Sequence, residues 1–170
     1  MSDHIAWALR RAREQTLALM ADVPAAAMQR QFVPGERHPA WLLGHLLLAD
    51  SYLLFLLDAR PLPDDFPQLI TQYGPASVPA PEGEARAHTK DELVGRLTAT
   101  DAARVARVLT MNDEALARPL VDAHLAQAQP TIGHHLMSLV FHEGYHSGQL
   151  AAWRKTHGFA PTRWTSGPQG

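Results

Sequence analysis

A long proline-rich connection divides this 170-residue chain and limits the folds open to it. It covers residues 60–88 and contains prolines at positions 61, 63, 67, 75, 79 and 81. On both sides of it, apolar residues recur at the 3.6-residue spacing of amphipathic helices. In a four-helix bundle, such a link lets the next helix run parallel to its predecessor. We therefore expect residues 1–170 to form one all-α domain, a four-helix bundle in the order up-down-down-up with a crossover between helices two and three.

Residue types at the boundaries support four helices. The expected ranges are 3–22, 39–59, 90–110 and 131–157. Pro39 stands at a first helical position, and Thr89 with Glu92 forms a capping box. Thr131 is the candidate N-cap of the last helix, with Gly158 just beyond its end. Shorter helical turns are expected at 64–73 and 113–117.

The helix expected over residues 39–59 is apolar nearly all round. A bundle helix with one exposed face should carry polar residues on it. The stripe opposite His45 consists of Leu43, Leu47 and Leu54. Two covers are available for it, the connection of residues 60–88 or the same face of a second subunit. We expect the second, a homodimer with this stripe in its interface.

Two histidines four residues apart lie on the apolar stripe of the last expected helix. His142 and His146 share one face of that helix, so both imidazoles can reach one metal ion. The alternative is a pair of core histidines satisfied by ordinary hydrogen bonds. His45 is the candidate third ligand because it sits inside a strongly apolar helix. Other histidines near helix ends or in connections are expected to be solvated: His4, His38, His88, His124 and His157.

The same segment spells H-E-x-x-H, the signature of zinc proteases. In those enzymes a third ligand follows downstream, but no Asp or Glu follows Glu143 in this chain. The extended form H-E-x-x-H-x-x-G-x-x-H also fails, because Gln149 and Ala152 occupy its Gly and last His positions. The sequence does not support a protease.

Two motifs together resemble one known family. Trp41-x-x-x-His45-Leu46, followed about a hundred residues later by His142-x-x-x-His146-x-Gly148-Gln149, is similar to the DinB-like four-helix-bundle superfamily of damage-inducible metalloproteins. The resemblance covers essentially the whole chain and includes the long link. It implies that His45, His142 and His146 bind a divalent metal, for which zinc, nickel and iron all suit histidine ligands. It also favours the homodimer, since similar proteins often pair.

Three further side chains are candidates for proton transfer at such a site. Glu143 is offset by about 100° from His142, with a solvated surface position as its alternative. His135 lies on the histidine stripe roughly 10 Å before His142, where lining a pocket is the simpler role. Asp101 falls near the middle of the third helix's apolar stripe, where it either holds a histidine or reaches solvent.

Neighbouring small and polar residues have expected roles as well. Gly144 and Gly148 are expected to allow close helix packing. Gln149 points near the histidine face, where it is expected to bond a ligand histidine.

Composition narrows the classes of function. A net charge of −2 gives no electrostatic case for binding nucleic acid or an anionic membrane. The chain has no Cys, so any thiol chemistry needs a thiol from outside. The N-terminus lacks a signal-peptide pattern. The longest apolar run, residues 41–57, is interrupted by His45, Asp50 and Ser51. We expect a soluble, cytoplasmic protein.

The expected function is that of a metal-dependent enzyme acting on a small molecule. Three neutral imidazoles leave an ion its full charge and open positions, as in catalytic rather than structural sites. Characterised relatives include S-transferases and isomerases that use low-molecular-weight thiols, so the resemblance favours an S-transferase. A hydrolase using metal-activated water and a non-catalytic metal-binding protein of the stress response are the alternatives.

Overall fold

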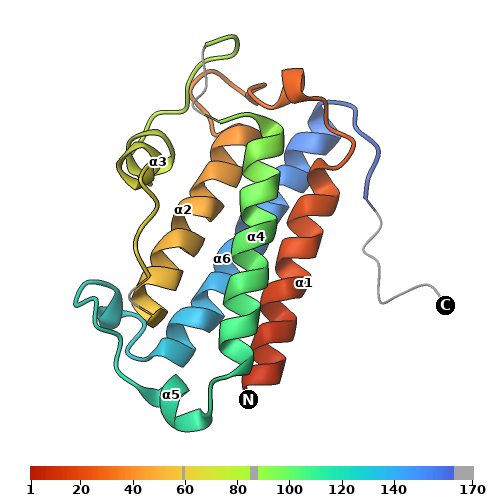
Figure 1. Cartoon of the computed structure of the whole chain (residues 1–170). Coiled ribbons are helices and arrows are strands. Elements are labelled where there is room, and N and C mark those ends of the chain that lie inside the picture. Colours follow the sequence, from red (N-terminus) through yellow and green to blue (C-terminus); the bar gives the residue numbers. More distant parts are fainter. Residues whose placement is uncertain (59, 85–87, 163–170) are drawn as a thin grey trace, which may run out of the picture.

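The computed structural model in Figure 1 describes residues 1–58, 60–84 and 88–162. Its four long helices are α1 (Ser2–Met20), α2 (Pro39–Asp58), α4 (Lys90–Leu109) and α6 (Ile132–Thr156). Shorter elements are α3 (Phe66–Tyr73), α5 (Asp113–Ala117) and 3-10 turns at Ala25–Ala27 and Leu125–Gln127. The described residues contain one isolated β-bridge and no strand. The all-α prediction is confirmed, and each long helix begins and ends within two residues of its expected range.

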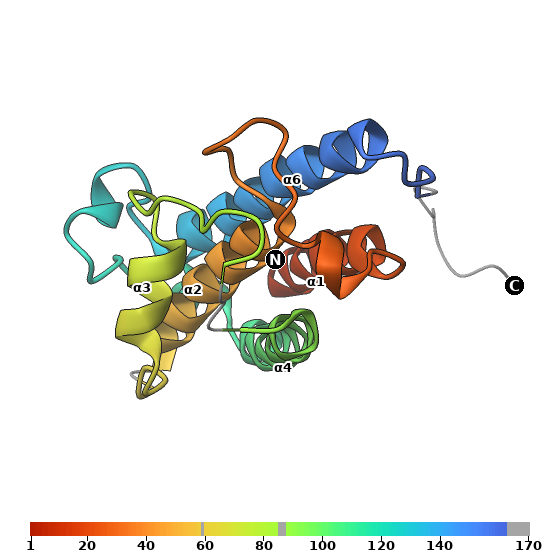
Figure 2. The same ribbon diagram turned by 90° about the horizontal axis from the view of Figure 1, so that it is seen from above.

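The long helices run up, down, down and up in Figure 1, as the length of the crossover predicted. Contacts between α1 and α6 advance in the same direction along both helices, since Arg13 pairs with Glu143 and Thr16 with Ser147. These two helices are therefore parallel. Seen from above in Figure 2, α3 flanks α2 on the side away from α1.

Helix ends follow the sequence signals. Thr89 and Glu92 form the reciprocal capping box at the start of α4. The Thr131 side chain accepts a hydrogen bond from the backbone N–H of His134 and so caps α6. Gly158 follows α6 with a φ of 76°, in the left-handed region that favours glycine. These local features hold α6, which carries the histidine pair, in its expected register.

The leucine stripe on the back of α2 is buried within the single chain. Leu43 and Leu47 are fully buried, and Leu54 is 8% exposed. Leu43 and Leu47 share one apolar cluster with Leu93 and Leu97 of α4 and with Leu69 and Tyr73 of α3. The expectation that this stripe forms a subunit interface is wrong, because α4 and the crossover helix already cover α2. A homodimer stays a prediction, but it needs another face.

Among the described residues, α2 is the one helix long and apolar enough to cross a membrane. Of its most apolar window, 67% is buried inside the bundle. That burial is typical of the core helix of a soluble protein, and the neighbouring helices account for the apolar composition.

Candidate metal centre

Three histidines from α2 and α6 meet at one point, as the sequence predicted. Nε2 of His142 lies 3.1 Å from Nε2 of His45 and 3.0 Å from Nε2 of His146. The candidate ligand nitrogens of the three residues all lie within 4.8 Å of one another. His146 is buried and His142 is partly exposed, so the cluster sits at the edge of the core with access from solvent.

The donor set fits one divalent ion. Zinc–imidazole bonds of about 2.0–2.1 Å place neighbouring nitrogens about 2.9 Å apart at a right angle and about 3.4 Å apart at a tetrahedral angle. The two separations from His142 fall between these values. Nitrogen donors of this kind suit zinc, nickel or iron.

Hydrogen bonds fix the tautomers of two of these rings. The Nδ1–H of His45 donates to the backbone carbonyl of Tyr73 at 2.8 Å, and that of His146 donates to Oε1 of Gln149 at 2.6 Å. A proton held on Nδ1 leaves a lone pair on Nε2, where a ligand atom is needed. The expected bond between Gln149 and a ligand histidine is therefore present.

Burial keeps the cluster neutral. It lowers the pKa of His142 and of His146 to about 4, and it lowers the pKa of His45 as well. Near pH 7 all three imidazoles are therefore neutral, which is the form that binds a metal.

An aromatic side chain and a cationic side chain line the site on the side of α2. The Trp41 ring stacks on His45 with ring centroids 4.8 Å apart, and its Nε1–H donates to Ser77 Oγ at 2.8 Å. The Arg37 guanidinium lies over the other end of this stack, 4.4 Å from the Trp41 ring centroid. The motif residue Trp41 thus packs directly against a candidate ligand and brings a positive charge close to it.

The crossover reaches the site through Tyr73, at the end of α3. A Cβ at position 44 would lie 2.4 Å from Cγ of Tyr73, so only glycine lets the tyrosine ring pack against α2 beside His45. The Tyr73 hydroxyl meets Nδ1 of His88 at 3.2 Å, and Nε2 of His88 meets Asp65 at 2.9 Å. The crossover therefore supplies the hydrogen bond that orients His45.

Glu143 points away from the three histidines. It is 1% exposed, and it accepts hydrogen bonds from Arg13 of α1 and Arg104 of α4. Asp50 of α2 bonds the same two arginines, at 2.9 and 2.7 Å. A solvated surface position for Glu143 is thus wrong, since two arginines compensate its burial. Its role in proton transfer stays a prediction.

The two other proton-transfer candidates also have defined partners. Oδ1 of Asp101 accepts from Nε of Arg104 at 3.0 Å, so this carboxylate holds an arginine instead of a histidine. His135 is buried, and its Nδ1 bonds the Gln129 side chain. A role of Asp101 and His135 in proton transfer stays a prediction.

Two histidines expected in solvent are buried. Nδ1 of His38 accepts from the backbone N–H of Trp41 at the start of α2, and His88 lies between Tyr73 and Asp65. In the sequence His38 precedes Pro39, and His88 lies just before α4. Neither position reveals which groups the histidine side chain bonds. Gly144 and Gly148 also differ from expectation, because a Cβ at either would meet nothing within 4 Å.

The fold and these residues define a class, the helical bundles with a three-histidine constellation between facing helices. The sequence profile of the DinB superfamily matches residues 8–150, and the chain belongs to that superfamily. A crystal structure titled as the conserved protein of a locus from Enterococcus faecalis shares the fold, with a TM-score of 0.67 and 19% identity. The alignment covers 91% of this chain and 95% of that one. No curated protein matches the chain with significant similarity.

Proposed function

We propose that the protein binds one divalent metal ion through His45, His142 and His146 and uses it as an S-transferase for a low-molecular-weight thiol. The observation that carries the proposal is the convergence of three neutral imidazole nitrogens with 3.0 and 3.1 Å between neighbours. Superfamily membership and the partial exposure of His142 support it. A cytoplasmic location, where such thiols are reduced and abundant, suits this activity.

The electrostatics of the site favour activation of a thiol. Both hydrogen bonds that orient ligand rings end on neutral oxygens, from Tyr73 and Gln149, so no orienting carboxylate offsets the charge of an ion. The buried carboxylates Asp50 and Glu143 are already paired with two arginines. A divalent ion held this way would lower the pKa of a coordinating thiol so that it reacts as thiolate.

The same charges favour an anionic thiol or acceptor. Burial is the main cause of the lowered pKa of His45 and of His146, and the positive charge of Arg37, whose guanidinium lies over Trp41, lowers both further. An anionic group on the bound thiol or acceptor would complement this arginine. Arg37→Met is then expected to raise KM for the anionic partner about tenfold with a smaller change in kcat.

The metal site is tested with His142→Ala. Elemental analysis should show that metal occupancy collapses, because one of the three donors is lost. The fold should persist in circular dichroism, with the metal-free protein changed by about 1 kcal/mol or less, since His142 is only partly buried. His134→Ala, at an α6 histidine outside the cluster, is the control and should keep its metal. Full metal retention in His142→Ala would exclude this ligand set.

The reaction class is tested on the pure metal-loaded protein. It is offered several low-molecular-weight thiols together with an electrophilic acceptor, and turnover is followed by thiol consumption. Turnover that requires the thiol supports the transferase. Turnover with water alone would show a hydrolase, and no turnover by a metal-loaded protein would favour a non-catalytic metal-binding role.

A further inference from the structure

A second group of polar side chains lies two helical turns from the histidine cluster, between α2 and α6. Tyr52 follows His45 by seven residues, and His135 precedes His142 by seven. Seven residues make about two turns, so each side chain lies about 10 Å along its helix from a candidate ligand and on nearly the same face. Because α2 and α6 run in opposite directions (Figure 1), Tyr52 and His135 are level with each other.

One ring nitrogen of His135 is engaged and the other is open. Gln129 donates through its Nε2 to Ser138 Oγ at 2.8 Å, which leaves its Oε1 to accept the Nδ1–H of His135. Nε2 of His135 therefore carries a lone pair, and it bonds no residue that the structure describes. Within the described part of the chain, the buried side-chain polar atom without a partner is Nε of Arg154, so Nε2 of His135 reaches solvent although the residue is only 6% exposed. An open acceptor on a buried ring points to a ligand.

Asp122 adds a negative charge beside this acceptor. Its Oδ2 accepts from the Tyr52 hydroxyl, and its Oδ1 accepts from the backbone N–H groups of His124 and Leu125, both at 2.9 Å. These hydrogen bonds, the one from Tyr52 most of all, lower the pKa of Asp122 and keep it ionised. The donors are a hydroxyl and backbone groups, and no cationic side chain of the described residues bonds this carboxylate. Asp122 is close enough that its charge raises the pKa of His135 against the lowering effect of burial.

The connection that carries Asp122 and Gln129 is held against the start of α6. Pro119 and Thr131 form an antiparallel bridge, in which the backbone N–H of Ile132 donates to the carbonyl of Arg118 at 3.0 Å. The two side chains therefore have fixed positions beside His135. Tyr52, Asp122, Gln129 and His135 are called the polar layer below.

We propose that the polar layer binds an ammonium group of the thiol whose sulfur coordinates the metal, an inference that rests on the proposed function. The lone pair of His135 and the carboxylate of Asp122 accept two N–H groups, and the ammonium balances the charge of Asp122. The other end of the site has the opposite sign, because Arg37 lies over Trp41, which precedes His45 along α2. The site thus matches a zwitterionic thiol that lies along α2 and α6.

The spacing defines the size of this thiol. An extended chain gains about 1.2 Å per bond, so a distance of about 10 Å corresponds to roughly eight bonds between sulfur and nitrogen. A short peptide thiol has this length. An amino group next to the sulfur-bearing carbon stops near the metal and does not reach the polar layer.

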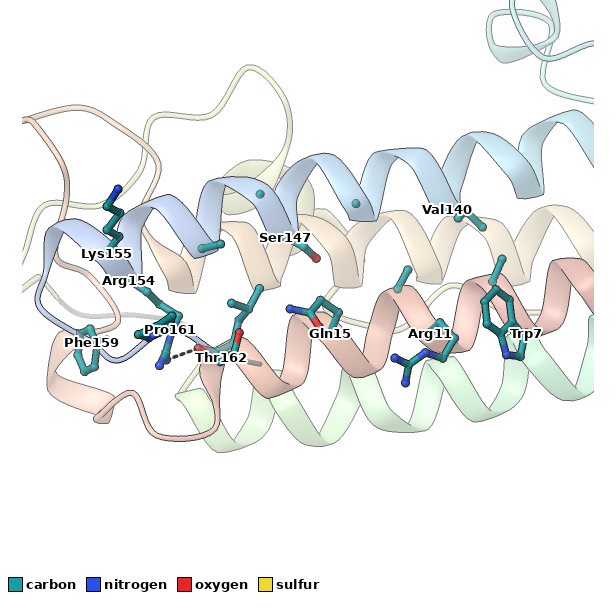
Figure 3. Close-up of a pocket in the computed structure, with 16 residues that line it drawn as sticks. Trp7, Arg11, Gln15, Val140, Ser147, Arg154, Lys155, Phe159, Pro161 and Thr162 are labelled. Carbon is teal, nitrogen blue, oxygen red and sulfur yellow. Dashed lines mark hydrogen bonds between the residues drawn. The ribbon is translucent and has the colours of Figure 1, made fainter. Parts of the chain in front are cut away.

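A larger hollow of about 1030 Å³ lies elsewhere, between α1 and α6, and Figure 3 shows the residues that line it. Gly144 and Gly148 belong to its lining, and at about 100° per residue they lie on the face of α6 opposite His142. The Ser147 hydroxyl in the same lining is bonded to Thr16 at 2.8 Å. A molecule bound at the histidines does not reach this groove, so the polar layer is the surface that meets it.

The test uses the protein loaded with Co²⁺, in which a coordinating thiolate gives a charge-transfer absorption band and so reports thiol binding without turnover. The probe is an aminothiol with about eight bonds between sulfur and nitrogen. Its N-acetylated form has the same spacing and no charge, and is the matched control. We expect the wild type to bind the aminothiol at least about tenfold more tightly than the acetylated form, because charge-assisted hydrogen bonds are stronger than neutral ones. Aminoethanethiol, whose nitrogen lies close to the sulfur, should show no such preference over its own acetylated form.

Two substitutions then locate the ammonium. Asp122→Asn and His135→Asn should each reduce the preference to about twofold or less, since each removes one acceptor of the ammonium. Asn at position 122 keeps an acceptor for Tyr52, and Asn at position 135 keeps an N–H for Gln129, so both variants should fold, which circular dichroism checks. His134→Asn, at an exposed histidine of α6, is the control and should keep the full preference.

The outcomes separate this inference from the proposed function. Equal affinity of the wild type for the two long thiols, or a preference that survives either substitution, would overturn the ammonium site and leave thiol coordination intact. If the charge-transfer band stayed absent with every thiol, coordination of a thiol would itself be excluded, and the ammonium site with it.

Discussion

Two polar clusters share α6 and differ in almost every physical respect. His142 joins the three-histidine cluster, whereas the next residue, Glu143, joins a cluster of four charges with Arg13, Asp50 and Arg104. The histidines are neutral near pH 7, and His142 is partly exposed. The charged side chains are 1–2% exposed and draw one residue from each long helix.

The difference separates what the bundle uses for stability from what it presents to a ligand. Each charge of the buried cluster is met by opposite charges, and the carboxylates raise the pKa of Arg13 and Arg104 against the lowering effect of burial. Such a cluster is complete and accepts no ligand. The candidate ligand nitrogens of the three histidines lie within 4.8 Å of one another, in an arrangement that could hold a metal ion.

The largest effect is expected from breaking the charged cluster. Arg13→Met removes a cation that bonds Glu143 at 2.6 Å and Asp50 at 2.9 Å. It leaves buried negative charge undercompensated, which costs about 3–5 kcal/mol of unfolding free energy. Urea denaturation measures this loss. Arg11→Met, at a partly exposed arginine of the same helix, is the control and should cost less than about 1 kcal/mol. Equal costs would show that the buried cluster contributes no special stability.

A smaller effect is expected from displacing the crossover at the histidine cluster. In Gly44→Ala the new methyl group would meet the Tyr73 ring, so the tyrosine must move and its carbonyl must withdraw from His45. Metal affinity should fall about 10–100-fold, as for other residues that orient ligands. Competition with a chromophoric chelator measures it. Gly95→Ala provides the control, since its methyl group meets nothing, and should leave affinity unchanged. Unchanged affinity in both would leave Tyr73 without a role in orienting His45.

The sequence predicted the histidine cluster better than the charged one, for a physical reason. A pair four residues apart on an apolar stripe is a local pattern, and a third histidine in an apolar helix completes it. The charged cluster consists of single residues from four helices, and each resembles an ordinary surface charge until the helices are packed. Asp50 lies in a helix that is apolar nearly all round, and this is the signal that the sequence offers for the charged cluster.

Coverage of helix faces was equally hard to predict. The stripe of Leu43, Leu47 and Leu54 has the pattern of an interface, because sequence periodicity shows which faces are apolar but not what covers them. Its cover comes from α4 and from α3, distant in sequence. The helix ranges were accurate since they depend on caps, prolines and spacing, which are all local.

A third cluster gives a pH-dependent effect of intermediate size. Hydrogen bonds from Arg96, and next from His88, lower the pKa of Asp65 to about 2, against about 3.9 for an unfolded aspartate. The carboxylate therefore stabilises the fold fully above about pH 4, and this contribution is lost as the pH falls from there through 2. Asp65→Asn should cost about 1 kcal/mol near pH 7 and progressively less below pH 4. Urea denaturation at pH 7, 5 and 3 measures the gap, with Asp64→Asn as control. A gap that stays constant on acidification would contradict the assigned charge pair.

The smallest effect is expected at Asp101. A role in the histidine cluster and a role in the charged cluster predict different results for its substitution. A carboxylate that oriented a ligand histidine would, on substitution by Asn, weaken metal affinity about 10–100-fold. In the structure its partner is Arg104, which also bonds Asp50 and Glu143. Asn keeps an acceptor oxygen for that arginine, and two carboxylates still balance its charge. Asp101→Asn should therefore change metal affinity less than about twofold and cost about 1 kcal/mol or less in unfolding free energy. Chelator competition and urea denaturation on the same preparation separate the two outcomes, and a tenfold loss of affinity without a loss of stability would couple Asp101 to the histidines after all.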